Sequence, residues 1–75
     1  MSKWFKVTCV KDNTNTNRHS YQKNKEYYIY DHWHDADAGE TCLDIYSNGE
    51  FVETILEDKF AWFWNNFQVI ENVPI

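Results

Sequence analysis

Two histidines and three aspartates lie between residues 31 and 37, a combination that can ligate a metal ion. His32 and His34 are two residues apart, so on a strand both rings share a face. Zinc requires three or four such ligands, and no cysteine pair stands at metal-binding spacing. An EF-hand loop beginning at Asp35 would place Glu40 where glycine is required. We therefore expect an exposed polar loop and no cofactor, with a metal site as the alternative.

Two further pairs have the residue types of a catalytic site. His19 and Ser20 are adjacent, but nucleophilic catalysis also needs an orienting acid, and the surrounding segment is polar. Asp44 and Glu53 would form a carboxylate pair if their strands pair in register, but acid–base chemistry requires a water-poor cleft around it. A domain of this size has little room for such a cleft. We predict that the protein is not an enzyme.

The composition is aromatic and acidic. The 75 residues include 4 Trp, 5 Tyr and 5 Phe, and 12 Asp and Glu outnumber 7 Lys and Arg, for a net charge of −5. This many rings argues against a disordered chain, and no apolar run approaches the roughly 20 residues that span a bilayer. The start of the chain lacks the pattern of a signal peptide. We therefore expect a cytoplasmic protein without a membrane partner, in which Cys9 and Cys42 are buried, reduced thiols.

Alternating apolar and polar residues predict about five short antiparallel strands in one domain over residues 1–75. The expected strands cover residues 4–10, 26–33, 41–47, 50–56 and 67–71, and polar loops follow the first two. The alternation breaks after residue 56. There we predict a short helical or 3-10 turn near residues 58–64, which Asp58 is placed to cap.

The dipeptide Asn48-Gly49 predicts a two-residue type I′ hairpin, because both of its positions require positive φ. A regular register then places Tyr46 opposite Phe51, Ile45 opposite Val52, and Asp44 opposite Glu53. The expected inner face comprises Phe5, Val7, Cys9, Tyr27, Ile29, Leu43, Ile45, Val52, Phe60, Phe67 and Val69. Five short strands without a long helix would leave exposed edges as a flat sheet, so we expect a small closed or nearly closed barrel.

Four segments resemble the small SH3-like barrel proteins of bacteriophages and bacteria: residues 5–13, 23–29, 48–50 and 58–70. One departure is Asn24, where that pattern usually has glycine. The resemblance implies an all-β, SH3-like fold. It also implies an accessory role in which a phage protein binds and redirects a host protein, although a fold by itself is weak evidence for function.

More rings are present than the predicted core requires. One reading is that about half of the surplus closes the barrel ends. The other is an exposed aromatic patch with an acidic rim, as in protein interfaces. The expected anchors are Tyr28, Tyr30, Tyr46, Phe51, Trp62 and Trp64, and the expected rim charges are Asp44, Glu53, Glu57 and Asp58.

An acidic rim would steer the protein toward a basic surface, such as that of a host protein that handles nucleic acid. The predicted function is therefore a non-enzymatic protein-binding module, a phage-encoded inhibitor or modulator of a host defence, transcription or replication protein in the bacterial cytoplasm. The alternative is a small barrel that binds single-stranded nucleic acid on exposed rings, which the net charge opposes. The expected state is a monomer or a small homo-oligomer.

Overall fold

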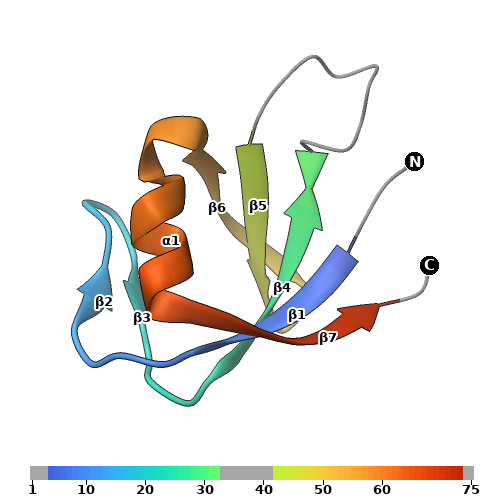
Figure 1. Ribbon diagram of the computed structural model, residues 1–75, viewed down its shortest axis with the longest axis horizontal. Coiled ribbons are helices and arrows are strands. Elements are labelled where there is room, and N and C mark those ends of the chain that lie inside the picture. The colour runs from blue at the N-terminus through green and yellow to red at the C-terminus, as the bar shows by residue number, and fades with distance from the viewer. Residues whose placement is uncertain (1–3, 33–41, 74–75) are drawn as a thin grey trace.

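The computed structural model describes residues 4–32 and 42–73. Within these residues, seven strands, the 3-10 turn η2 and one short helix follow one another (Figure 1). The strands are β1 (Trp4–Cys9), β2 (Thr14–Asn15), β3 (Ser20–Tyr21), β4 (Glu26–Asp31), β5 (Cys42–Ser47), β6 (Glu50–Leu56) and β7 (Phe67–Val73). The turn η2 (Glu57–Lys59) and the helix α1 (Phe60–Asn66) separate β6 from β7.

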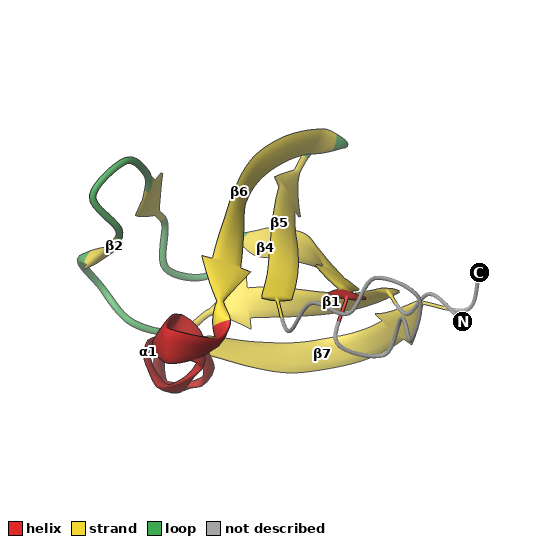
Figure 2. Ribbon diagram, turned by 90° about the horizontal axis from the view of Figure 1, so that it is seen from above, coloured by secondary structure: helices red, strands yellow, loops and turns green. Residues whose placement is uncertain are grey.

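Five of these strands form one antiparallel sheet in the order β6-β5-β4-β1-β7, and β2 pairs with β3 in a small second sheet. The prediction of a mostly β protein with about five antiparallel strands is confirmed. The sheet is strongly curved, and α1 lies at the corner where β6 ends and β7 begins (Figure 2). The β2–β3 hairpin lies within a segment predicted to be an irregular loop.

The predicted helical turn is present, but its predicted cap is wrong. Asp58 lies inside η2, and neither η2 nor α1 has a side-chain hydrogen bond at its N-cap. The turn follows directly on β6, so Leu56 occupies the cap position of η2 in an extended conformation, and leucine has no side-chain acceptor.

Most of the predicted inner face is buried, because alternate residues of β1, β4 and β5 point toward the same side of the curved sheet. Val52 and Phe60 are partly buried against this core, and both Cys9 and Cys42 are buried and unbridged, as predicted. The predicted inward position of Val69 is wrong, since 42% of its surface is exposed. It lies on the edge strand β7, whose pairing with β1 shifts register between Lys6 and Val7.

The predicted register of the β5–β6 hairpin holds near the turn and then fails. Asn48 and Gly49 both have positive φ, of 54° and 83°, and Tyr46 pairs with Phe51. The register then shifts by one residue, so that Ile45 pairs with Glu53 instead of Val52.

The irregularity reverses which β6 side chains face inward, because neighbouring residues of a strand point to opposite faces. Ile55 enters the core, and Glu53 lies on the same face as Ile45. Asp44 pairs with Thr54, so the predicted opposition of Asp44 and Glu53 is wrong.

Asn24 occupies a backbone position that disfavours most side chains. Its φ is 71°, in the left-handed region, and its N–H donates to the carbonyl of Cys9 at 2.7 Å. Asparagine and glycine tolerate this conformation better than other residues. This accounts for the departure at residue 24, where asparagine stands in place of glycine.

Substitution of Asn24 tests this backbone conformation. We expect Asn24→Ala to lower the free energy of unfolding by about 1 kcal/mol, and Asn24→Gly to leave it within about 0.5 kcal/mol of wild type. Urea denaturation monitored by tryptophan fluorescence measures both. Equal stability of the alanine and glycine variants would contradict a left-handed residue at this position.

Candidate functional site

The outer face of the sheet carries a set of neighbouring rings. Because Phe5 and Ile29 face the core, the alternate residues of β1 and β4 face outward. Strand pairing then sets Trp4 opposite Tyr30, and Tyr28 opposite Tyr46. We call the rings of Trp4, Tyr28, Tyr30, Tyr46 and Phe51 the outer aromatic face.

Ring contacts make most of this face continuous. The centroid of Trp4 lies 5.0 Å from that of Tyr30 and 5.1 Å from that of Tyr46, and Tyr46 lies 5.7 Å from Phe51. These distances are those of favourable aromatic pairs. Phe51 is 55% exposed and Tyr28 is 39% exposed, so the face combines a packed centre with rings that remain accessible.

Lys6 lies on this face, and two carboxylates neutralise its charge. The Nζ atom of Lys6 lies 3.5 Å from Glu26 and 3.6 Å from Glu71, and 5.4 Å from the centroid of the Tyr28 ring. Contact with the Tyr28 phenol, followed by the charge of Glu26, raises the pKa of Lys6 above its ordinary value. The Tyr28 ring therefore already accepts a cation, while the local charge stays negative.

Asp44 is held in place by two neighbours on the same face. His32 Nε2 lies 2.5 Å from Asp44 Oδ2, and Thr54 Oγ1 donates to Asp44 Oδ1 at 2.6 Å. The His32 ring also lies edge-on to Tyr30, with centroids 4.5 Å apart. Asp44 is thus an ordered carboxylate at the border of the outer aromatic face.

The hypothetical metal site at His32 and His34 falls partly outside the described residues, because His34 and the aspartates that follow it lie there. Within residues 4–32 and 42–73, no group of three histidine, cysteine or acidic side chains is placed to hold a metal ion. His32 instead contacts Asp44.

The structure divides the predicted binding residues among several places. Tyr28, Tyr30, Tyr46, Phe51 and Asp44 lie together on the outer face, where strand alternation placed them. Glu53, Asp58 and Trp62 line a separate groove at the end of β6. Trp64 stacks on Phe5 at the other side of the helix, and Glu57 is exposed in η2.

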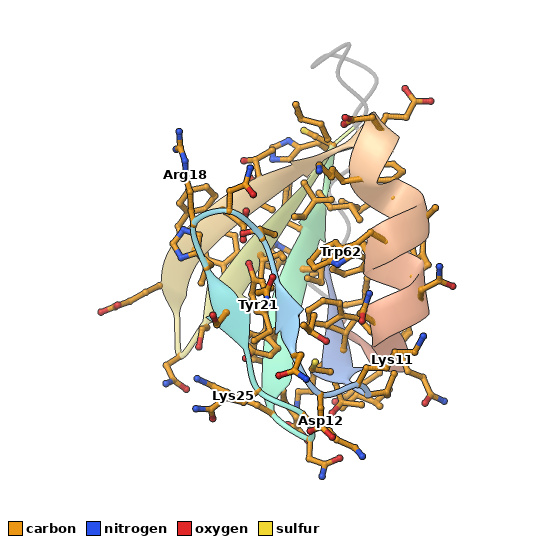
Figure 3. The ribbon with its side chains drawn as sticks, turned by 90° about the vertical axis from the view of Figure 1, so that its left-hand side faces the viewer. Lys11, Asp12, Arg18, Tyr21, Lys25 and Trp62 are labelled. Carbon is orange, nitrogen blue, oxygen red and sulfur yellow. The ribbon has the colours of Figure 1, made fainter. Side chains whose placement is uncertain are left out.

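The groove has a volume of about 400 Å³ and lies between the β2–β3 loop and the segment from β6 to α1. Residues 15–18 form one wall, and residues 53–56, Asp58, Lys59 and Trp62 form the rest. Figure 3 shows Arg18 at the tip of the loop and Trp62 on the loop-facing side of α1.

Tyr21 anchors the β2–β3 loop, whose residues 15–18 form one wall of the groove. Its hydroxyl donates to the carboxylate of Glu53, and Thr16 Oγ1 donates to the same oxygen at 2.9 Å. The Tyr21 ring packs edge-on against Tyr27 and Phe67 and is 4% exposed. Burial, followed by the hydrogen bond to Glu53, raises the pKa of Tyr21 well above its ordinary value of 10.0.

Sequence reasoning missed both Tyr21 and the inward turn of Glu53. Tyr21 is a single ring in a polar segment, with no alternating neighbours to mark it as buried. Glu53 follows an irregularity that alternation does not reveal. The contact between Tyr21 and Glu53 thus joins the β2–β3 loop to β6, and no local sequence pattern links these two segments.

Comparison with known proteins returned no match among family models, curated sequences or solved structures. Among the described residues, no helix combines the length and the apolar character that crossing a membrane requires.

Proposed function

We propose that the protein is a non-enzymatic protein-binding module whose outer aromatic face docks on a basic surface of another protein. The observation that carries this proposal is the row of contacting rings on an outer sheet face, with Phe51 and Tyr28 exposed. Tyrosine and tryptophan are enriched among the residues that dominate protein interfaces. A packed, rigid set of rings also loses little side-chain entropy when a partner binds.

Charge indicates the kind of partner. Lys6 is neutralised by Glu26 and Glu71, whose side chains are more than half exposed, and Glu50 is exposed at the hairpin tip. An acidic border favours association with a basic surface. Arginine side chains would stack on the ring faces, as Lys6 already does on Tyr28.

The proposed role is that of a phage-encoded inhibitor or modulator of a host defence, transcription or replication protein, acting in the bacterial cytoplasm. Its support is the resemblance to small SH3-like barrel proteins of phages and bacteria. The strong curvature of the five-stranded sheet supports the same SH3-like fold class. Basic surfaces are common on proteins that handle nucleic acid, so competition with DNA or RNA is the mechanism we favour.

Binding of single-stranded nucleic acid is the second candidate, because rings on a sheet face can stack bases. Such binding also needs free cations along the path of the phosphates. On this face Lys6 is already paired with two glutamates, and the whole chain has a net charge of −5. Protein binding is therefore our first proposal.

Affinity capture from nuclease-treated bacterial host lysate tests the proposal. We expect a captured protein whose affinity, once it is purified and measured by calorimetry, falls about tenfold or more in Tyr28→Ala and in Phe51→Ala. Val69→Ala is the matched control, since Val69 is 42% exposed on β7 and Tyr28 is 39% exposed. It should bind as wild type does.

Three results would overturn the proposal. One is retention of nucleic acid alone when nuclease is omitted, which supports the second candidate. Another is equal binding by wild type, Tyr28→Ala and Phe51→Ala, which places the interface elsewhere. The third is self-association detected by light scattering and lost in Phe51→Ala, because the outer aromatic face would then be the contact between copies of this chain.

A further inference from the structure

Strand β6 has a free backbone edge that opens into the groove. It is the last strand of the sheet on its side, so among the described residues its second edge has no strand neighbour. The groove is lined by four consecutive residues of β6, 53–56. Consecutive side chains point to opposite faces, so a groove bounded by all four follows the edge of the strand rather than either face.

The loop across the groove approaches β6 through side chains alone. Among the described residues, Thr16 and Tyr21 reach β6, and both contact the carboxylate of Glu53. The backbone of the loop is satisfied within the loop, for example by the bond from Thr16 N–H to the His19 carbonyl at 2.8 Å. The edge beyond Glu53 therefore keeps backbone donors and acceptors that a further strand can pair with.

Two apolar side chains, those of Trp62 and Leu56, line the groove beside this edge. Trp62 is half-buried and packs against Tyr21 and Phe67, with centroids 6.4 Å and 6.0 Å apart. Leu56 also lines the groove and is 60% exposed. Together they offer a site for one apolar side chain of an added segment.

The charges of the groove differ from those of the outer aromatic face. Arg18 and Lys59 are exposed and form no ion pair with any other residue that the structure describes. Of the two carboxylates in the lining, Glu53 is engaged by Tyr21 and Thr16, which leaves Asp58. Glu53 keeps its charge, because both hydroxyls are neutral, but it is half-buried. The exposed cations of the lining, Arg18 and Lys59, thus outnumber its one exposed carboxylate, Asp58, in a protein whose net charge is −5.

We propose that this groove binds an extended, acidic peptide segment of another protein, which adds as a strand to the free edge of β6. Main-chain hydrogen bonds along the edge provide affinity, and side-chain sites provide specificity. One apolar side chain of the peptide packs on Trp62 and Leu56, and its carboxylates pair with Arg18 and Lys59. The site is separate from the outer aromatic face and does not rest on the proposed function.

An NMR titration of the full-length, ¹⁵N-labelled protein tests where a peptide binds. The probe is a pool of capped nonapeptides with two fixed glutamates and with Val, Ile, Thr or Tyr elsewhere. We expect shifts of the backbone amides of residues 53–56 and of the Trp62 indole, and none with a pool that carries lysine in place of glutamate. Equal response to both pools, or shifts confined to the outer aromatic face, would overturn the proposal.

Strand addition itself is tested on the tightest-binding peptide of the pool. A strand pairs through the N–H groups of alternate residues, so N-methylation of one alternate set should abolish binding while methylation of the other set should preserve it. Loss of binding with both sets, or with neither, would exclude pairing along the β6 edge. So would a protein that binds none of the peptides because a second copy already occupies the edge.

Charge reversal provides the matched variants. The side chain of Arg18 forms no hydrogen bond or ion pair within the described residues, so Arg18→Glu should fold as wild type does. We expect it to weaken peptide binding about tenfold, through loss of one attraction and gain of one repulsion. Lys23→Glu makes the same change at an exposed lysine outside the groove lining and should have little effect. If Arg18→Glu and Lys23→Glu weakened peptide binding equally, the effect would come from the net charge of the protein, and the proposed site would be wrong.

Discussion

Replacement of Phe63 by alanine should lower the free energy of unfolding by about 3–5 kcal/mol. Phe63 is fully buried, stacks on Phe67 with centroids 4.7 Å apart, and meets Trp64 edge-on at 4.9 Å. Its removal leaves a cavity between the helix and the core. A chain of 75 residues has a total stability of only about 4–11 kcal/mol, so this loss is a large part of it.

Urea denaturation at neutral pH measures the effect of Phe63→Ala. Phe51→Ala is the control, because the same chemical change at a residue that is 55% exposed should cost no more than about 1 kcal/mol. Should Phe63→Ala prove unfolded, Phe63→Leu keeps most of the volume and should cost about 1–2 kcal/mol. Equal losses at Phe63 and Phe51 would contradict the burial of Phe63.

The second large effect is a loss of stability in alkaline solution that depends on Tyr21. Its pKa is raised in the folded protein, chiefly by burial and then by Glu53. The folded protein therefore keeps a proton that the unfolded chain releases, and the free energy of unfolding falls as pH rises. This contribution is complete below the ordinary pKa of 10.0 and is lost as pH rises toward the folded-state value.

The expected size follows from proton linkage. Ionisation of Tyr21 in the unfolded chain alone should remove about 2–3 kcal/mol between about pH 9 and pH 12. Tyr21→Phe cannot ionise, so its stability should fall less steeply over this range. At neutral pH the same variant should be about 1–2 kcal/mol less stable than wild type, because the hydrogen bond to Glu53 is lost.

The free energies of unfolding of the two proteins should therefore become equal near about pH 11, and at higher pH the wild type should be the less stable of the two. Tyr27 and Lys6, whose pKa values are also raised, are present in both proteins and cancel in the comparison. Ser20→Ala is the control for disturbance of the loop and should keep the wild-type pH dependence. A constant difference between wild type and Tyr21→Phe across this range would show that Tyr21 ionises as readily in the folded protein as in the unfolded chain.

Local patterns predicted the outer face better than the groove. Tyr28, Tyr30 and Tyr46 face outward because β4 and β5 alternate regularly, and alternation is a property of consecutive residues. The groove joins residues 15–18 to residues 53–62, and no local signal links these segments. For this reason the sequence pattern grouped Glu53, Asp58 and Trp62 with the tyrosines, whereas in the structure these three residues line the groove.

The burial of Phe63 follows from the spacing of three phenylalanines in the sequence. Phe60, Phe63 and Phe67 are spaced three and four residues apart, which places them on one side of a helix. The neighbouring Trp62 and Trp64 are larger rings, and composition alone does not distinguish them from Phe63. The helix periodicity does, once a full helix rather than a single turn is expected over residues 60–66.

The β-rich class, the Asn48-Gly49 turn and the inner faces of β1, β4 and β5 could all be predicted from the sequence. These features depend on residues that are neighbours in the chain, through strand alternation and backbone preference at φ. Three features could not be predicted in this way: the register beyond the β5–β6 turn, the burial of Tyr21 and Phe63, and the separation of the rings between two surfaces. Each of these features depends on contacts between distant segments. For example, a single extra residue in β6 turns Glu53 toward Tyr21, which lies 32 positions earlier in the chain.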